Sequence, residues 1–151
     1  MTANASTESG EVISMANELA EPRRTAMVAL NQIGQIAITV RDLPRAVNFY
    51  RDVLGMRHLF DAGPKLSFFD CGGVRLMLDI PEQAEFRHPP SILYYKVEDI
   101  AAVHRELQGK GVRFEDEPHV IAKLPTHDLW MTFARDSEGN MFALMSEVTN
   151  R

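Results

Sequence analysis

GQIAITVRDLPRAVNFYRDVLGM, at residues 34–56, and SILYYKVEDIAAVHRELQGKGV, at residues 91–112, decide the fold of this chain. Each stretch begins with a β-rich segment, reaches an aspartate, and continues with apolar residues at helical spacing. Asp42 and Asp99 stand where the N-cap of a helix belongs, because their carboxylates can accept bonds from the first free N–H groups. Gly55 and the pair Gly109/Gly111 then supply a helix stop. The repetition predicts two copies of one structural plan.

Short β-rich runs follow each predicted helix. In the first copy they lie at 57–61, 65–71 and 74–80, and in the second at 112–123, 128–136 and 141–148. DSEGN, at residues 136–140, predicts a turn in which Gly139 takes a positive φ. We therefore expect an α+β fold with one βαβββ module at residues 29–82 and a second at 91–148. A polar, proline-rich linker at 83–90 joins them, and residues 1–28 are predicted to be a flexible N-terminal arm.

A cavity follows from this topology. A four-stranded sheet with one helix on one face still has a second apolar face to cover. Two modules that turn their curved sheets toward each other cover both faces, so we expect one curved eight-stranded sheet around a shared cavity.

Composition restricts the classes of partner. The chain is 45% hydrophobic and 25% charged with a formal net charge of −5, and its basic residues form no cluster with aromatics. We therefore expect no nucleic-acid partner. No apolar run reaches the ~18 residues that span a bilayer, and the polar N-terminus carries no hydrophobic signal segment, so no membrane partner and a cytoplasmic location are expected. Cys71 is the sole cysteine, which excludes an internal disulfide and any multi-cysteine zinc site.

The residues QIAITVRDLPRAVNFYRDVLG and the turn DSEGN resemble the glyoxalase I, bleomycin-resistance and extradiol-dioxygenase group, which is the vicinal oxygen chelate superfamily. The resemblance covers residues 33 to about 148 and implies the fold predicted above. It does not fix a reaction, because the group includes isomerases, lyases, epimerases, dioxygenases, thiol transferases and drug binders that catalyse nothing. From the habit of the family we expect a homodimer. The sequence leaves open whether the cavity forms within one chain or across two.

The resemblance also implies where a metal would be bound in metal-dependent members. Their four ligand positions correspond here to Gln35, Met77, Ile92 and Ala143. Gln35 is the one plausible ligand, because Met77 offers a thioether and neither an isoleucine nor an alanine side chain can coordinate a cation. A shift of the strands by one residue restores no donor set. We therefore expect no metal at this position and no cofactor.

Alternation along the strands predicts which other side chains face the cavity. With Gln35 as the anchor, the residues expected to contact a small-molecule ligand are Gln35, Thr39, Arg75, Met77, Ile92, Tyr94, Trp130, Met141 and Ala143. These residues describe a mostly apolar pocket with a few polar groups. The methionines have an alternative interpretation, which is that they fill space in a core without contacting a ligand.

Three functions compete. The first is a binding protein with a metal-free cavity for a small, partly apolar or aromatic molecule. The second is a lyase, isomerase or dioxygenase of the glyoxalase type that uses Gln35 and a non-standard metal set. The third is a metal-free acid–base enzyme that uses His127, Tyr94 or Lys96, with His127 and Asp128 as neighbours in a predicted loop. We rank them in this order, and the sequence does not decide whether the chain is an enzyme.

Overall fold

The first module has the predicted order of elements. The computed structural model describes residues 28–150, and the described residues from Ile33 onward form one compact unit. Strand β1 (Gln35–Thr39) leads into helix α1 (Leu43–Asn48), which continues without a break into a turn of π-helix, η1 (Phe49–Val53). The strands β2 (Arg57–Asp61), β3 (Leu66–Cys71) and β4 (Val74–Asp79) follow. The predicted N-terminal arm lies outside the described residues, apart from Val28.

The second module repeats this order with one additional strand. A single 3₁₀ turn, η2 (Ala84–Phe86), lies between the modules. The module then contains β5 (Leu93–Lys96), α2 (Ile100–Gly109), β6 (Arg113–Phe114), β7 (His119–Lys123), β8 (His127–Arg135) and β9 (Met141–Thr149). The predicted β-rich run at 112–123 is therefore two short strands, which pair with different parts of β8. Among the described residues, no helix is long and apolar enough to cross a membrane.

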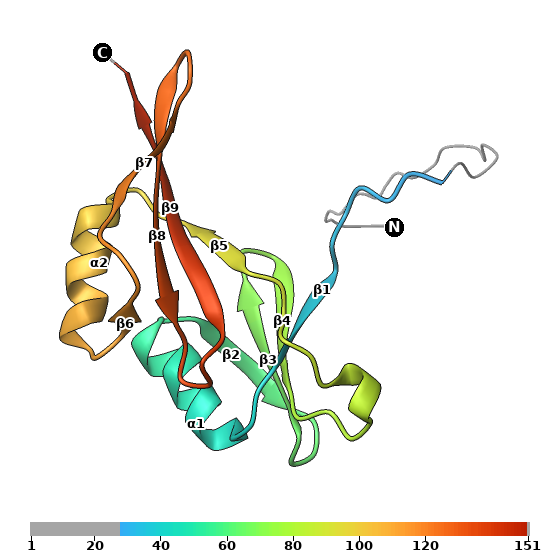
Figure 1. Cartoon of the computed structure of the whole chain (residues 1–151). Coiled ribbons are helices and arrows are strands. Elements are labelled where there is room, and N and C mark those ends of the chain that lie inside the picture. Colours follow the sequence, from blue (N-terminus) through green and yellow to red (C-terminus); the bar gives the residue numbers. More distant parts are fainter. Residues whose placement is uncertain (1–27, 151) are drawn as a thin grey trace, which may run out of the picture. The chain divides into compact units, whose positions relative to one another are not determined.

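Each module forms its own sheet, with corresponding strands in corresponding places (Figure 1). The first sheet has the order β1-β4-β3-β2, and the second has the order β5-β9-β8-β6 with β7 also paired to β8. In both sheets the first strand lies parallel to the last, β1 beside β4 and β5 beside β9. This shared topology confirms the predicted α+β fold of two repeated modules. The strands form two sheets, of four and five strands, in place of the single eight-stranded sheet that was expected.

The local signals of the sequence are realised at the ends of the helices. Asp42 accepts a hydrogen bond from the backbone N–H of Arg45, and Asp99 accepts one from Ala102. Gly55 and Gly111 have φ values of +73° and +92°, which are costly for other residues. The π-helical turn η1 was not predicted. It arises where the N–H of Leu54 bonds to the carbonyl of Phe49, five residues earlier.

The helix-side faces of the two sheets carry the apolar core. In the first module Tyr50, Phe69, Leu76 and Leu78 are almost fully buried, and in the second Phe142 and Leu144 are 3% exposed. Phe49 and Leu54 pack against both clusters, and the rings of Phe49 and Phe142 lie 6.4 Å apart, edge to face. The end of the first helix therefore connects the two cores. This packing places the helix-side faces of both modules against a common apolar interior.

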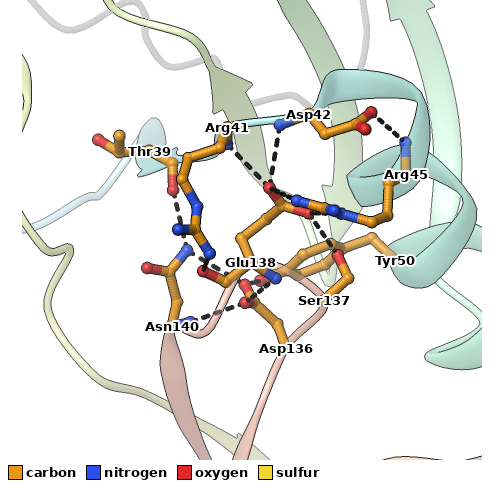
Figure 2. Close-up of polar contacts among 9 residues, drawn as sticks. All are labelled: Thr39, Arg41, Asp42, Arg45, Tyr50, Asp136, Ser137, Glu138 and Asn140. Atoms are coloured by element: carbon orange, nitrogen blue, oxygen red, sulfur yellow. Dashed lines mark hydrogen bonds and ion pairs between the residues drawn. The ribbon is translucent and has the colours of Figure 1, made fainter.

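A buried polar cluster holds the same two modules together; we call it the inter-module cluster (Figure 2). Its centre is Glu138, in the turn between β8 and β9, whose side chain is 1% exposed. The Glu138 carboxylate accepts bonds from the backbone N–H groups of Arg41 and Asp42, at 2.8 and 3.0 Å, and from the Arg45 guanidinium at 2.8 Å. The turn is thus fixed to the start of α1 by charge-assisted bonds.

Asp136 provides the second half of the inter-module cluster. Its carboxylate accepts a 2.6 Å bond from the hydroxyl of Tyr50 and further bonds from the backbone N–H groups of Glu138 and Asn140. The Asn140 amide in turn donates to the carbonyl of Thr39, at the end of β1. Gly139 has the predicted positive φ, +86°. The turn DSEGN therefore connects the modules in addition to joining two strands.

The surroundings of Glu138 and Tyr50 shift the pKa values of both side chains. Burial alone would raise the pKa of Glu138, but the bonds from Arg45, Arg41 and Asp42 outweigh it and lower the pKa to about 2. Burial and the negative charge of Asp136 raise the pKa of Tyr50 well above its ordinary value. At neutral pH the cluster therefore consists of a carboxylate at Glu138 and a protonated donor at Tyr50.

Candidate functional site

The face of the first sheet opposite its helix carries a guanidinium on an aromatic ring. The Nε of Arg75 donates a 2.9 Å bond to the Oε1 of Gln35, and the Gln35 amide lies 3.6 Å from the Sδ of Met77. The Cζ of Arg75 lies 5.4 Å from the centre of the Phe68 ring. The predicted residues Gln35, Arg75 and Met77 are thus brought together. They form one surface with Phe68, which we call the Arg75 surface.

Two phenylalanines on this face were not predicted as site residues. Phe68 is paired in register with Met77, so its side chain lies on the same face of the sheet. Phe60 lies 4.7 Å from Phe68, ring to ring, and is 47% exposed. Strand alternation could have identified Phe68 if the register of β3 against β4 had been known. The pairing of Phe60 could not have been found in this way, because a β-bulge shifts the register between His58 and Phe60.

The corresponding face of the second sheet is aromatic and mostly apolar. Tyr94 and Phe133 flank Ala143 on the two neighbouring strands, and their rings meet edge to face with centroids 5.9 Å apart. Ala143 beneath them is fully buried, whereas Tyr94 is 45% exposed. Phe133 is a further residue that sequence reasoning missed, because the register of β8 was not fixed by its sequence. This face offers a flat wall for an aromatic or apolar ligand.

Trp130 was predicted to face the cavity, and this prediction is wrong. Trp130 packs against the apolar cluster of Phe142 and Leu144, on the helix side of the second sheet. The register explains the error, because Trp130 has the same parity along β8 as Thr132 and Ala134, which are both fully buried. Met131 and Phe133 consequently point to the opposite face.

Three other predicted residues line one pocket that both modules form. Thr39 from the end of β1, Ile92 from the segment before β5 and Met141 from the start of β9 line a pocket of about 820 Å³. The linker supplies Arg87 and His88 to the same pocket, and Pro81 from the end of the first module also lines it. The pocket thus contains residues of both modules, but most residues expected in the shared cavity are not part of its lining. Gln35, Arg75, Met77 and Tyr94 do not line it.

Of the candidate acid–base residues, Tyr94 and Lys96 share one face of β5, but His127 lies apart from them. Tyr94 on β5 is in register with Ala143 of β9. His127 on β8 is in register with Thr149, six residues further along β9. At ~3.3 Å per residue the two positions are roughly 20 Å apart. The ring of His127 contacts the hydroxyl of Thr126, and its neighbour Asp128 pairs with Lys123 at 3.4 Å. Lys96 forms an exposed pair with Glu147 at 3.1 Å.

The residues at the family's metal positions do not fit a metal ion. The oxygen of Gln35, the one plausible donor, already accepts a bond from the positively charged Arg75. A cation bound there would be repelled by that guanidinium and would find a thioether and two alkyl groups at the other three positions. Within residues 28–150, no group of three or more His, Cys, Asp or Glu side chains is arranged to hold an ion. We therefore derive no chemistry through a metal.

Comparisons with known proteins agree with this architecture. Residues 32–144 match the family model of the Glyoxalase/Bleomycin resistance protein/Dioxygenase superfamily. The chain is 27% identical over 124 residues to the uncharacterized protein YetH of Bacillus subtilis, and this match covers 76% of the chain and 98% of YetH.

Solved structures show the same fold. A member of this superfamily from Sphaerobacter thermophilus superposes with a TM-score of 0.65 at 23% identity, and the match covers 78% of this chain and 98% of that one. A lactoylglutathione lyase from Agrobacterium tumefaciens superposes with a TM-score of 0.59 at 22% identity, covering 76% and 92%. On the family match and the two-module fold, the chain belongs to the Glyoxalase/Bleomycin resistance protein/Dioxygenase superfamily.

Proposed function

We propose that this protein binds a small, partly aromatic molecule without a metal ion. The observation that carries this proposal is the contact between Arg75 and Gln35, because it places a fixed positive charge where metal-dependent relatives hold their cation. The Phe68 ring beneath the guanidinium is buried, and the neighbouring Phe60 ring, which is 47% exposed, adds an apolar surface. A guanidinium on an aromatic ring favours planar ligands that carry a hydrogen-bond acceptor.

The two alternative functions receive less support. A metal-dependent lyase, isomerase or dioxygenase needs donors that the positions of Met77, Ile92 and Ala143 do not supply. A metal-free acid–base enzyme needs its acid and base within hydrogen-bond reach of one substrate atom. His127 is in register with Thr149 of β9, far from Ala143, the partner of Tyr94 on β5. Lys96 shares a face with Tyr94 but is paired with Glu147. Binding therefore remains the function that the geometry favours.

We further propose that a second copy of the chain completes the binding cavity. Each open face leaves large apolar side chains uncovered: Phe60 on the first sheet is 47% exposed, and Ile92 and Tyr94 on the second are 40% and 45% exposed. In one chain the helix-side faces of the two modules share a core through Phe49, which leaves both open faces uncovered. A homodimer could set the Arg75 surface of one copy against the face that carries Tyr94 and Phe133 in the other. Such a dimer would cover both open faces. A cytoplasmic location stays a prediction.

A thermal-shift screen of small aromatic molecules, run with a chelator present, tests the binding function. Compounds that bind the folded protein should raise its melting temperature by mass action. Hits should lose most of their effect in Arg75→Gln and keep it in Arg113→Gln, a matched exposed arginine on β6. If the shifts are equal in both variants, the Arg75 surface is not the binding site.

Mixed dimers test whether two copies share the cavity. One parent chain carries Arg75→Gln and the other carries Tyr94→Ser, so neither homodimer has an intact site. If the cavity forms across two chains, the mixed dimer regains one intact pair of faces and binds a hit from the screen at half stoichiometry. Should the mixture bind no more than its parents at concentrations at which the variant chains still form dimers, the cavity lies within one chain. Analytical ultracentrifugation gives the oligomeric state independently.

A further inference from the structure

The pocket that both modules line has an unusual balance of charge. Its walls contain four cationic side chains, Arg41, Lys65, Arg87 and Arg135, and one carboxylate, Glu138. The whole chain has a formal net charge of −5, so this concentration of positive charge does not reflect the composition. The Glu138 side chain is 1% exposed and is engaged by Arg45. It therefore presents little negative charge to the interior of the pocket.

Two of the four cations already have carboxylate partners. Lys65 pairs with Glu82 at 3.3 Å, and Arg135 pairs with Glu115 at 3.1 Å. Both pairs are at the surface, where such contacts are weak and screened by salt. Lys65 and Arg135 add to the positive potential of the pocket, but they are not the strongest candidates for direct contact with a ligand.

Arg41 and Arg87 are held instead by backbone carbonyls. The Nη2 of Arg41 donates to the carbonyl of Glu138 at 3.0 Å. The Nε and Nη2 of Arg87 donate to the carbonyls of Pro81 and Glu82, at 3.3 and 3.4 Å. Within the part of the chain that the structure describes, neither guanidinium forms an ion pair with a carboxylate. Each is thus oriented by neutral acceptors while its charge remains available to a ligand.

The remaining walls of the pocket suit an apolar body. Ile80, Pro81, Pro90, Ile92 and Met141 line it beside the two arginines, and Thr39 and Asn140 add polar atoms. Guanidinium groups bind carboxylate and phosphate groups through paired, charge-assisted bonds. A volume of about 820 Å³ is in the range of sites that take up small organic molecules.

We propose that this pocket binds an organic anion, a carboxylate or phosphate attached to an apolar body, through Arg41 and Arg87. The site lies within a single chain and shares no residue with the Arg75 surface. It therefore does not depend on the proposed function of that surface. This pocket would select its ligand by negative charge. The Arg75 surface would select its ligand by planar shape.

An NMR titration with three probes of similar size tests this proposal. Benzoate and phenyl phosphate carry the anion, and benzamide is the neutral analogue of benzoate; all are added at constant ionic strength. We expect one or both anions to bind with shifts at residues that line the pocket, and benzamide to bind at least tenfold more weakly. The anion that binds more tightly tells a carboxylate ligand from a phosphate ligand.

Arg87→Gln is the principal variant, because the Arg87 guanidinium donates to the nearby backbone carbonyls of Pro81 and Glu82. It should weaken binding of the anion at least tenfold, whereas Arg105→Gln should not, because that matched exposed arginine lies on α2 outside the pocket. Three results would each overturn the proposal: no binding of either anion, equal binding of benzamide, or the same affinity in Arg87→Gln as in Arg105→Gln. Loss of binding in Arg75→Gln but not in Arg87→Gln would assign the anion to the other site.

Discussion

The two sides of each sheet differ in how much of their structure depends on the other module. On the helix side, Phe49 packs on both cores, and Glu138 and Asp136 bind groups of the first module although they belong to the second. On the open side, Phe60 and Tyr94 are nearly half exposed. The helix side thus stabilises the single chain, and the open side is left for a ligand or a second copy. Substitutions on the two sides should therefore have different consequences.

The largest effect should follow from removing the carboxylate of Glu138. Glu138→Ala leaves the N–H groups of Arg41 and Asp42 without their acceptor and removes the partner of Arg45. We expect a loss of about 2–4 kcal/mol in the free energy of unfolding, measured by urea denaturation. Glu138→Gln keeps one oxygen for the backbone donors and should lose less. Equal losses in both variants would contradict a role for the negative charge.

The second largest effect should be a fall in the free energy of unfolding at acidic pH. The pKa of Glu138 is about 2 in the folded chain, below the ordinary value of 4.5, so its stabilising effect is present above about pH 4.5 and is lost as the pH falls toward 2. This shift corresponds to roughly 3 kcal/mol of stability. Unfolding free energies measured between pH 6 and pH 2.5 should fall more steeply for the natural chain than for Glu138→Gln. Parallel curves would show that Glu138 does not titrate in this way.

A smaller effect is expected for Tyr50→Phe. The substitution removes the 2.6 Å bond to Asp136 but keeps the ring in the core, and Asp136 retains its bonds from Glu138 and Asn140. A buried hydrogen bond to a charged group contributes about 1.5–3 kcal/mol, so we expect a loss near the lower end of that range. The midpoint of chemical denaturation measures it. An unchanged midpoint would mean that the inter-module cluster does not depend on this bond.

The smallest effect on the stability of the chain is expected on the open side. Tyr94→Ser removes a half-exposed ring whose aromatic contact is with Phe133. We expect a loss of less than about 1 kcal/mol for the isolated chain. Self-association should weaken at least tenfold, which sedimentation equilibrium can measure. The distinction between the two sides would fail if Tyr94→Ser lost as much stability as Tyr50→Phe and still self-associated like the natural chain.

Much of the fold could be predicted from the sequence because its signals are local. Asp42 and Asp99 cap their helices as expected, and alternation placed Gln35, Arg75 and Met77 on one face. Trp130 was misplaced because β8 carries large apolar side chains at consecutive positions, Leu129, Trp130 and Met131, so that alternation does not fix its face. The π-helical turn has no local signal in the sequence that distinguishes it from one more turn of α-helix.

The non-local parts of the site could not be predicted. Glu138 lies in a polar turn, where a glutamate is usually solvated, and its partner Arg45 is 93 residues away in the sequence. The contact of Arg75 with Gln35 depends on the pairing of β1 with β4, which are 40 residues apart. The positive charge of the pocket that both modules line depends on the path of the linker, because Arg87 belongs to the linker. Such contacts depend on the tertiary fold and not on periodicity.

We propose that Arg75 provides the fixed positive charge at the position of the family's metal. Measuring the metal content of the protein tests this most directly. The full chain is purified without chelators, dialysed against a mixture of zinc, nickel, iron, manganese and magnesium salts and then against buffer, and analysed by mass spectrometry for each element. We predict far less than one metal ion per chain, and no change in Gln35→Ala or Arg75→Gln. One tightly held ion per chain that is lost in Gln35→Ala would contradict this account.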